Sequence, residues 1–508
     1  MSSKLIPSEH LDRLRPLGAQ IERSGARAWI VGGYPRDLLL NRVTGDVDLA
    51  VEGDAPELAR RFADDTGGSW ILLDEATGTA RIVWPDATAA QIKVMDFARL
   101  RASTLEEDLR GRDFTINALA LPLEQAGDWD GSDLLDPLGG HDDLEMRVLR
   151  ACSQHALRDD PLRMLRAARL AAQLDLHLTD QLDQALRAHR GLIANVSAER
   201  VRDEMLKLLA MPHAAPWVIY LDDVRLLTTI IPELEPARDC DQPLFHFLPV
   251  LGHLLEAVVA AEWMIAQLYA SLGLSYALTR LPEAAQTVPD LAARFPQGGE
   301  IVDRLEESVD GVPRVALFKL AVLLHDVAKP QTKLPKPGGG VSFYDHQTIG
   351  ADVAYAVARR RRMSRGAAEY IRLIVREHMR PGQLSDYGQE LTNRARYRFF
   401  RDAGEATPEV LLHSLCDYLA VKGPNIQAAN WEEYVTWTVG MLDSLRGEET
   451  VAKQEPLLRG DDLMRELGLR PGPVIGRLLE RVREAHVTGE IQTREEALAL
   501  AHRAAAEG

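Results

Sequence analysis

The stretch Trp29–Glu52, which reads WIVGGYPRDLLLNRVTGDVDLAVE, decides the fold of this chain. Its apolar start, Trp29–Val31, predicts a short buried strand. Gly32 and Gly33 then interrupt the strand and bring backbone N–H groups to the surface. A helix is predicted to begin near Pro35, because proline suits the first turn of a helix. The stretch therefore predicts a strand, a glycine turn and a helix in succession.

The end of the same stretch predicts a second strand with one acidic face. Acidic and apolar residues alternate from residue 46 to residue 51, so Asp46 and Asp48 share one face and apolar side chains take the other. Carboxylates held this close repel each other, and a divalent cation relieves the repulsion. Hard oxygen ligands suit Mg²⁺, which also binds substrate phosphates, and the glycine turn offers N–H donors to those phosphates. These features predict metal-dependent nucleotidyl transfer.

Short strands are predicted after this stretch, and one of them carries a third candidate carboxylate. Strands are predicted at 70–73, 80–84 and 91–97, after a helix at 55–66. Asp96 lies on the last of these strands. Two interpretations remain open: Asp96 is a further catalytic carboxylate from a neighbouring strand, or it is an ordinary aspartate at a strand end.

Two arginine–aspartate pairs follow, and each has two interpretations. Arg112 and Asp113, in GRDFTINALAL, either orient a triphosphate or form a structural ion pair. Residues 155–235 have a helical period, and Asp160 and Arg163 stand three residues apart on one predicted helix face. This pair either presents an acceptor and a donor fork that imitate the edge of a base, or forms an ion pair at a helix start.

Composition and charge indicate a soluble chain of several domains. It has 508 residues, of which 46% are hydrophobic and 27% charged. No run of about 18 apolar residues and no signal-peptide core is present, so we expect a cytoplasmic protein with no membrane partner. Three distant cysteines, Cys152, Cys240 and Cys416, predict neither a disulfide framework nor a zinc site. The net charge of −17 argues against indiscriminate binding of polyanions, although a local basic face such as 158–169 would allow a nucleic-acid partner.

Five motifs resemble, in order, those of the bacterial class II tRNA nucleotidyltransferase and poly(A) polymerase family. They are GGYPRDLLL with DVDLAV, GRDFTINALAL, DPLGGHDDL, DDPLRMLRAARLAAQL and SAERVRDEMLKLL. The resemblance implies an α+β fold, with a polymerase-β-like nucleotidyltransferase head at 1–150. A helical neck and body, which contains the nucleotide-selecting motif, would follow at 151–238.

The same resemblance implies roles for individual residues. Asp46, Asp48 and Asp96 would be catalytic, with Mg²⁺ held by the first two. The nucleotide-binding residues would be Gly32, Gly33, Arg36, Arg112, Asp113, Asn117, Asp160, Arg163, Arg166 and Arg169. The expected partners are the 3′ end of tRNA and CTP, with ATP as a further substrate where the full CCA is added. The motifs leave the oligomeric state open.

Four departures from the family pattern bear on nucleotide choice. Pro35 replaces a usual valine, Gly111 a usual arginine and Asp159 a usual glutamate. The fourth departure is the short connection FARLRAST between Asp96 and Leu105. Relatives that add the full CCA carry a longer basic, tyrosine-containing loop there, whereas relatives that add only two cytidines resemble the short form. CC addition is therefore favoured over full CCA addition.

The second half of the chain resembles the HD phosphohydrolase superfamily. Its metal ligands would be His253, His325, Asp326 and Asp417. Imidazole together with carboxylate suits Mn²⁺, Ni²⁺, Fe²⁺ or Mg²⁺, and such an ion activates water against a phosphate ester. His346 and His378 would either complete a second metal site or bind a substrate phosphate.

The predicted function joins two activities on one chain. The head would add C to tRNA without a nucleic-acid template. An α-helical HD domain at 239–425 would trim 2′,3′-cyclic or 3′-phosphate ends, and a helical tail would follow at 426–508. One alternative is a poly(A) polymerase, which a long basic tail would favour, whereas this tail is acidic to neutral. A further alternative is a non-catalytic RNA-binding protein on the same scaffold, against which the retained aspartates argue.

Overall fold

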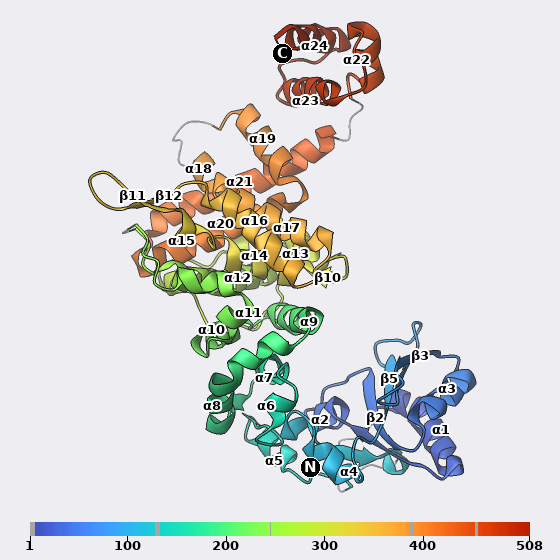
Figure 1. Ribbon diagram of the computed structural model, residues 1–508. Coiled ribbons are helices and arrows are strands. Elements are labelled where there is room, and N and C mark those ends of the chain that lie inside the picture. The colour runs from blue at the N-terminus through green and yellow to red at the C-terminus, as the bar shows by residue number, and fades with distance from the viewer. Residues whose placement is uncertain (1–5, 128–132, 244, 386–390, 453–455, 508) are drawn as a thin grey trace. The chain divides into compact units, whose positions relative to one another are not determined.

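The computed structural model describes residues 6–127, 133–243, 245–385, 391–452 and 456–507. By its internal contacts the chain divides into two compact units (Figure 1). The first unit contains Met1–Val196 and Val224–Leu226, and the second contains Ser197–Asp223 and Leu227–Gly508. The acidic strand motif therefore lies in the first unit, and the histidine motif lies in the second.

A mixed sheet forms the centre of the first unit. Its strands are β1 (Arg27–Val31), β2 (Asp46–Glu52), β3 (Ser69–Asp74), β4 (Thr79–Val83), β5 (Val94–Arg99) and β6 (Ala120–Pro122). They lie in the order β3-β4-β5-β2-β1-β6. β2 and β5 run parallel, and the other neighbouring strands are antiparallel. This order places the acidic strand beside the strand that carries Asp96.

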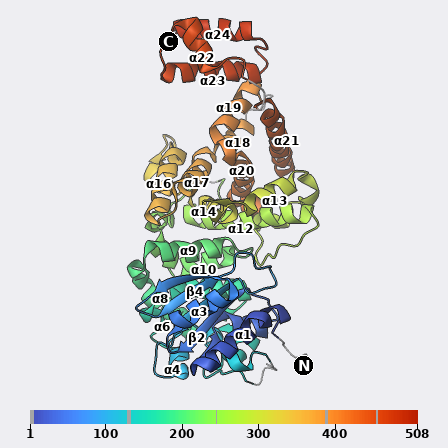
Figure 2. The ribbon, with the colours of Figure 1, turned by 90° about the vertical axis from the view of Figure 1, so that its right-hand side faces the viewer.

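Helices cover one face of this sheet. α1 (Ser8–Ser24) and α3 (Ala55–Thr66) pack on it, as Figure 2 shows. β2 buries its alternate apolar residues in the core beneath these helices. Asp46 and Asp48 lie on the opposite face of the strand and are exposed to solvent. The predicted alternation of the acidic strand is confirmed.

The remaining helices of the first unit begin with α2, which packs against β1 and β2, and continue along the chain to α8. They are α2 (Gly33–Leu39), α4 (Leu105–Arg110), α5 (Gly140–Glu145), α6 (Ala156–Asp159), α7 (Arg163–Leu174) and α8 (Asp180–His189), with a small parallel pair formed by β7 (Val148–Leu149) and β8 (His177–Leu178). The glycine turn and α2 follow β1 directly, as the sequence predicts.

The prediction that Asp160 and Arg163 share one helix face is wrong. α6 ends before Asp160, whose backbone is extended with φ −143° and ψ 99°. α7 begins only at Arg163. Pro161 explains the difference, because a proline disfavours the helical conformation in the residue before it. The two side chains therefore leave the backbone from different local structures.

The second unit consists mostly of helices. They are α9 (Ala198–Leu209), α10 (Ala215–Asp223), α11 (Leu226–Ile230), α12 (Val250–Ser271), α13 (Gly298–Glu306), α14 (Arg314–Leu324), α15 (Lys329–Thr332), α16 (His346–Arg360), α17 (Arg365–Glu377), α18 (Arg380–Ser385), α19 (Asn393–Ala403), α20 (Thr407–Lys422) and α21 (Ala428–Ala452). Two short hairpins lie between helices of this unit. β9 (Ser308–Val309) and β10 (Val312–Pro313) connect α13 to α14, and β11 (Lys333–Pro335) and β12 (Val341–Phe343) connect α15 to α16.

α12 is the one helix among the described residues that is long and apolar enough to cross a membrane. Of its most apolar 18-residue window, 89% is buried inside the protein, as in the core helix of a folded domain. From the sequence we expect no transmembrane helix, because no run of about 18 apolar residues is present. Two acidic residues, Glu256 and Glu262, lie within α12. The structure accommodates one of them, Glu262, by pairing it with the buried Lys319 at 2.8 Å and with the backbone N–H groups of Ala214 and Ala215.

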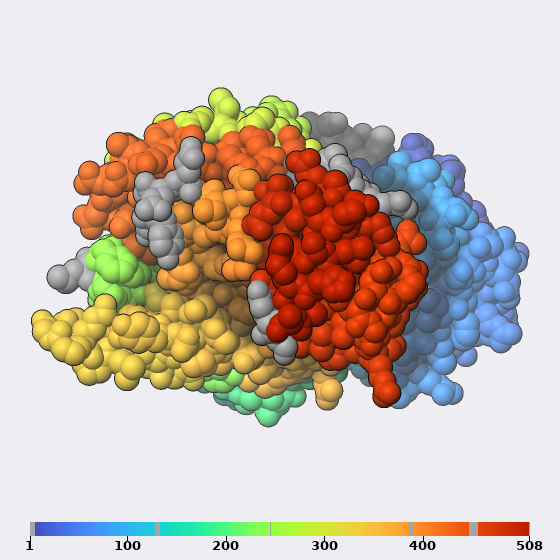
Figure 3. Space-filling view, turned by 90° about the horizontal axis from the view of Figure 1, so that it is seen from above, coloured from blue at the N-terminus to red at the C-terminus, as the bar shows by residue number. Residues whose placement is uncertain are grey.

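The C-terminal tail has a hydrophobic core of its own. Its helices are α22 (Gly460–Leu467), α23 (Pro473–Val487) and α24 (Arg494–Glu507), drawn in red in Figure 3. Leu463, Val482 and Ala501 lie at the centre of this core. The prediction of a helical tail is confirmed.

Candidate functional sites

Three aspartates gather on the exposed face of the sheet, and we call them the carboxylate cluster. Asp46 and Asp48 lie on β2, and Asp96 lies on β5 in direct register with Asp48. Partial desolvation by the neighbouring protein atoms and then the negative charge of Asp96 raise the pKa of Asp48, although the Arg112 guanidinium opposes this rise. A divalent cation among the three carboxylates would relieve the same repulsion. The donor set therefore fits the predicted metal site.

Arg81 belongs to this site and was missed in the sequence. It lies on β4 opposite Asp96 and donates two hydrogen bonds to it, from Nε to Oδ1 at 2.7 Å and from Nη2 to Oδ2 at 2.8 Å. The available signal was the alternation of β4, which buries Ala80 and Ile82 and leaves Arg81 on the acidic face. The bidentate pair orients Asp96 and offsets part of the negative charge of the cluster.

The glycine turn brings the backbone close to the carboxylate cluster. Gly32 has a φ of +77°, and a Cβ atom there would lie 3.2 Å from Oδ2 of Asp48 and 3.3 Å from Nη1 of Arg112. This approach and this backbone conformation both require glycine. Arg112 also donates to Asp108, with Nη2 3.4 Å from Oδ2. Arg112 thus places N–H donors beside the carboxylates, where phosphates meet a metal ion, whereas the N–H of Gly32 is bonded to the carbonyl oxygen of Leu119 at 3.3 Å.

A buried polar network lies behind the glycine turn. Arg36 donates to Asp37 at 2.9 Å and to Asn117 at 2.6 Å, and Asn117 donates to Asp113 at 3.1 Å. Arg166 on α7 donates two further hydrogen bonds to Asp113, at 2.7 and 3.0 Å. Burial opposes ionisation of Asp113, but Arg166 outweighs it and lowers the pKa of this carboxyl. The network fixes the turn against α7, and direct contact of these residues with a nucleotide stays a prediction.

The predicted nucleotide-selecting residues engage the backbone around α6 and α7. Arg163 donates to the carbonyl oxygens of Gly111 at 2.8 Å and Ala156 at 3.2 Å. Oδ1 of Asp160 accepts a backbone N–H of the turn that follows it, at 3.2 Å. Arg169 donates to a glutamine side chain one turn further along α7. Arg163 therefore connects the start of α7 to the segment that carries Arg112.

In the second unit six predicted residues meet in one buried site, which we call the histidine centre. They are His253, His325, Asp326, His346, His378 and Asp417. They come from α12, the end of α14, the start of α16, the end of α17, and α20. Residues up to about 160 positions apart in the chain thus share one site, as helix packing allows.

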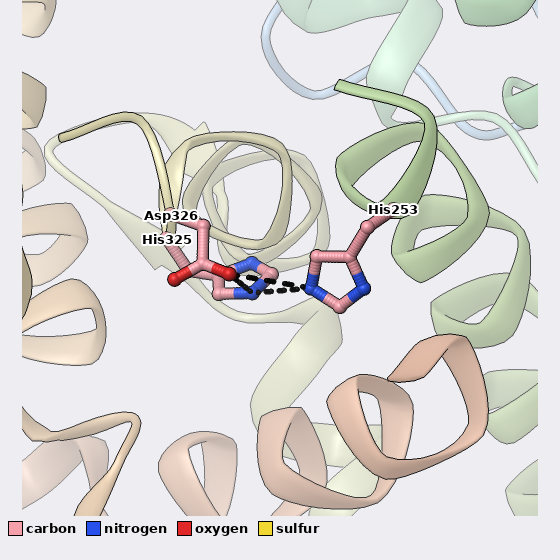
Figure 4. A group of neighbouring side chains, drawn as sticks. All are labelled: His253, His325 and Asp326. Atoms are coloured by element: carbon pink, nitrogen blue, oxygen red, sulfur yellow. Dashed lines mark hydrogen bonds and ion pairs between the residues drawn. The ribbon is translucent and has the colours of Figure 1, made fainter. Parts of the chain in front are cut away.

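One side of the histidine centre converges on His253. Figure 4 shows His253 facing His325 and Asp326. Its Nε2 lies 3.0 Å from Nε2 of His325, 3.4 Å from Oδ2 of Asp326 and 3.1 Å from Oδ1 of Asp417. Atoms that share one metal ion at about 2.1 Å lie about 3.0–3.4 Å apart. These four side chains therefore fit a common divalent ion.

The other side of the histidine centre converges on the second oxygen of Asp326. Oδ1 of Asp326 lies 3.2 Å from Nε2 of His346 and 3.6 Å from Nε2 of His378. All three side chains are buried. The structure thus brings the two accessory histidines to the same carboxylate as the predicted ligands.

Charges within the histidine centre compensate one another strongly. Burial opposes protonation of His325, but the carboxylates of Asp326 and Asp417 raise its pKa to about 10. Burial also opposes ionisation of Asp326, yet Lys329 and His325 hold the pKa of this carboxyl well below its usual range. The carboxylates therefore require cations beside them, a condition that a metal ion also meets.

Two neighbours of the histidine centre were not found in the sequence. Nζ of Lys329 lies 2.5 Å from Oδ2 of Asp326 and 2.7 Å from the side-chain oxygen of Gln242. The signal for Lys329 was its position three residues after Asp326, at the other end of the turn that joins α14 to α15. His413 is fully buried on α20, with its ring centre 4.6 Å from that of His325. It stands one turn before Asp417, which was the signal for it.

Four family models match the chain. They describe a poly A polymerase head domain at residues 28–150, an RNA and SrmB binding site of polymerase A at 175–238, an HD domain at 298–422, and a tRNA nucleotidyltransferase domain 2 at 425–501. The head model covers the carboxylate cluster, and the HD model covers all of the histidine centre except His253.

Known proteins match over nearly the whole length. The A-adding tRNA nucleotidyltransferase of Deinococcus radiodurans is 34% identical, over 94% of this chain and 96% of its own length. The CC-adding tRNA nucleotidyltransferase of Geobacter sulfurreducens is 32% identical, over 95% of this chain and 94% of its own. A solved CCA-adding enzyme in complex with ATP has a TM-score of 0.62 at 20% identity, covering 98% of this chain and 95% of that one.

Fold, motifs and matches together define a nucleotidyltransferase with a polymerase-β-like head and an HD domain, so the predicted fold class is confirmed. The chain belongs to the tRNA nucleotidyltransferase family.

Proposed function

We propose that this chain adds C to the 3′ end of tRNA in a Mg²⁺-dependent reaction without a nucleic-acid template. The observation that carries the proposal is the carboxylate cluster beside the glycine turn, in a chain of this family. Asp46 and Asp48 would hold Mg²⁺, which supplies stabilisation of charge on the attacking 3′ oxygen and on the pyrophosphate leaving group. A donor set made of oxygens alone favours Mg²⁺ over softer ions.

The surrounding residues would bind and orient the nucleotide. The turn at Gly32 and the guanidinium of Arg112 lie beside Asp48 and would hold the triphosphate. Asp96 would be the third carboxylate, oriented by Arg81. The buried network through Asp113 would keep the turn in place beside the nucleotide.

A short connection supports CC addition. β5 ends at Arg99 and α4 begins at Leu105, and the N–H of Arg101 is bonded to the side chain of Asp108 at 3.0 Å. This short connection is the form that the family resemblance associates with the addition of two cytidines only. Addition of a single A is a second candidate, because a relative 34% identical to this chain is named as A-adding.

Two tRNA substrates separate the candidates. One ends at the discriminator base and the other already ends in CC, and each is incubated with labelled CTP or ATP and sized. CC addition extends the first substrate by two cytidines and leaves the second unchanged. Extension of the second substrate by one A, with no extension of the first substrate, would overturn CC addition in favour of A addition. Full CCA, a long A tail, or no extension would instead identify the other three candidates.

The site assignment has its own test. Asp46→Ala and Asp48→Ala should each abolish addition while the protein keeps its thermal unfolding transition. Asp65→Ala, an exposed aspartate on α3, is the matched control and should leave addition unchanged. Near-normal addition by Asp46→Ala or Asp48→Ala would contradict the assignment.

The histidine centre would prepare RNA ends for the head. We propose that it hydrolyses 2′,3′-cyclic phosphate ends to phosphomonoesters, and 3′-phosphate ends to the free 3′ hydroxyl that addition needs. His253, His325, Asp326 and Asp417 would hold a divalent ion, which supplies Lewis acidity toward the phosphate ester. Imidazole donors favour Mn²⁺ or Ni²⁺ over Mg²⁺. Hydrolysis of a cyclic phosphate is measured with Asp326→Ala as the control, and undiminished activity in that variant would refute the assignment.

We also propose that the protein acts in the cytoplasm, where tRNA ends are completed. Domain boundaries near residues 150, 238 and 425 remain predictions from the motifs.

A further inference from the structure

The histidine centre is open to solvent beside Asp417. The side chain of Asp417 is 22% exposed, whereas those of the other five residues of the centre are each at most 7% exposed. A substrate phosphate therefore reaches the centre past Asp417. The residues that surround this opening decide which molecules can present a phosphate to the centre.

An exposed aromatic ring lies at this opening. Phe245 is 58% exposed, and its ring centre lies 4.3 Å from that of His246. The ring centre of His246 in turn lies 5.7 Å from that of His253, whose Nε2 is 3.1 Å from Oδ1 of Asp417. Two ring contacts therefore connect the exposed ring of Phe245 to the candidate metal ligands, a distance that one nucleotide can span.

A lysine stands beside the same ring. Nζ of Lys422 lies 5.6 Å from the ring centre of Phe245 and 5.8 Å from that of Tyr418. Tyr418 directly follows Asp417 in α20 and stacks on Tyr434, with ring centres 5.1 Å apart. Among the described residues no carboxylate forms an ion pair with Lys422, so its ammonium can pair with a phosphate.

An aromatic ring with an ammonium beside it is the combination that binds single-stranded nucleic acid, because every base stacks and every backbone phosphate attracts a cation. Single-stranded RNA ends also offer an unstacked base to aromatic side chains. A phosphate that carries no base would leave the ring of Phe245 uncovered. The opening therefore fits the last nucleotide of an RNA strand better than it fits a phosphate alone.

We propose that Phe245 and Lys422 form a subsite for an unpaired RNA 3′ nucleotide at the entrance of the histidine centre. The base stacks on Phe245, and the terminal phosphate enters past Asp417. Lys422 holds the phosphate that joins this nucleotide to the rest of the strand, because the terminal phosphate faces the candidate metal ligands. The proposal rests on the proposed hydrolysis at this centre and identifies the part of the RNA that the centre selects.

Three cyclic phosphates separate the parts of the subsite. They are an RNA oligonucleotide with a 2′,3′-cyclic phosphate end, cytidine 2′,3′-cyclic phosphate, which has no further phosphate, and glycerol 1,2-cyclic phosphate, which has no base. Phe245→Leu should raise KM about tenfold for the first two compounds with little change in kcat, because stacking binds the substrate before it reacts. The KM of the third compound should stay unchanged, and Phe245→Tyr should keep the original KM for all three.

The lysine has a separate signature. Lys422→Met should raise KM about three- to fivefold for the oligonucleotide alone, and by less at high salt, whereas Lys422→Arg should keep the original KM. Tyr344→Leu is the matched control: Tyr344 is 70% exposed and lies two residues before His346, so it is a second exposed ring near the centre, and its loss should change no KM. Circular dichroism confirms that each variant is folded.

An unchanged KM for the oligonucleotide in Phe245→Leu would overturn the subsite and leave the proposed hydrolysis standing. An equal rise in KM for glycerol 1,2-cyclic phosphate, or a larger rise in Tyr344→Leu, would overturn it as well. If the unaltered chain hydrolysed none of the three compounds, the proposed hydrolysis would fail, and calorimetry would decide the subsite. Cytidine 3′-monophosphate should then bind the unaltered chain more tightly than it binds Phe245→Leu, and equal binding would overturn the subsite too.

Discussion

The carboxylate cluster and the histidine centre both gather acidic residues, but they do so in opposite ways. The cluster lies on neighbouring strands of a sheet, uses oxygen donors alone and faces solvent. The centre lies among packed helices, is rich in imidazole, and is almost wholly buried. An open site of oxygens suits Mg²⁺ that arrives with a triphosphate, whereas a buried site of nitrogens suits an ion that stays bound.

The largest predicted effect is that a substitution in one site abolishes the activity of that site and leaves the other activity intact. Asp48→Asn should lower nucleotide addition by roughly a thousandfold or more, because a metal ligand is lost, and should leave hydrolysis of a cyclic phosphate within about twofold. Asp326→Asn should have the reverse effect. Both activities are measured on the same preparation, with Asp65→Asn as the control. Loss of both activities in either single variant would show that the two sites are not independent.

The next effect concerns metal choice. After chelation, addition should recover with Mg²⁺ alone, whereas hydrolysis should recover at least about tenfold more with Mn²⁺ or Ni²⁺ than with Mg²⁺, following the preference of imidazole for these ions. Titrations of each metal against each activity make the measurement. If hydrolysis recovered as well with Mg²⁺ as with Mn²⁺ or Ni²⁺, the two sites would not differ in metal preference.

A smaller effect is expected at the nucleotide-selecting motif. Arg163 holds Gly111 and Ala156 through backbone carbonyl oxygens, so Arg163→Ala loses those contacts as well as any contact with a base. We expect addition to fall about tenfold, with weaker discrimination between CTP and the other nucleotides. Competition between labelled CTP and UTP measures the discrimination. Arg187→Ala, an exposed arginine on α8, is the control and should change neither quantity.

Local pattern explains which parts of these sites were predictable. Asp46 and Asp48 followed from strand alternation, and Asp96 joined them because a parallel neighbour brings it into register. The histidine centre has no such local pattern, since its residues come from helices far apart in the chain. It was identified only through a family resemblance.

The misses have equally specific causes. Arg81 pairs with Asp96 across strands, and strand pairing cannot be read from one strand. The spacing of Asp160 and Arg163 predicts one helix face, but the proline between them interrupts the helix. Lys329 stands three residues after Asp326, but only the folded turn between α14 and α15 shows that its ammonium reaches the carboxylate.

The smallest predicted effect tests how open the carboxylate cluster is. Arg81 is bonded to Asp96 but is 40% exposed in its side chain, so solvent screens much of its charge. Arg81→Met removes a positive charge from a site that binds a cation, and we expect Mg²⁺ to bind about two- to fivefold more tightly, the equivalent of about 0.5–1 kcal/mol. The concentration of Mg²⁺ at half-maximal addition measures this. Arg61→Met is the control, because Arg61 forms an exposed pair with Glu57 on α3. Weaker binding of Mg²⁺ by Arg81→Met would mean that Arg81 acts mainly by orienting Asp96 as a metal ligand. The orientation of Asp96 would then matter more for Mg²⁺ binding than the repulsion between Mg²⁺ and the charge of Arg81.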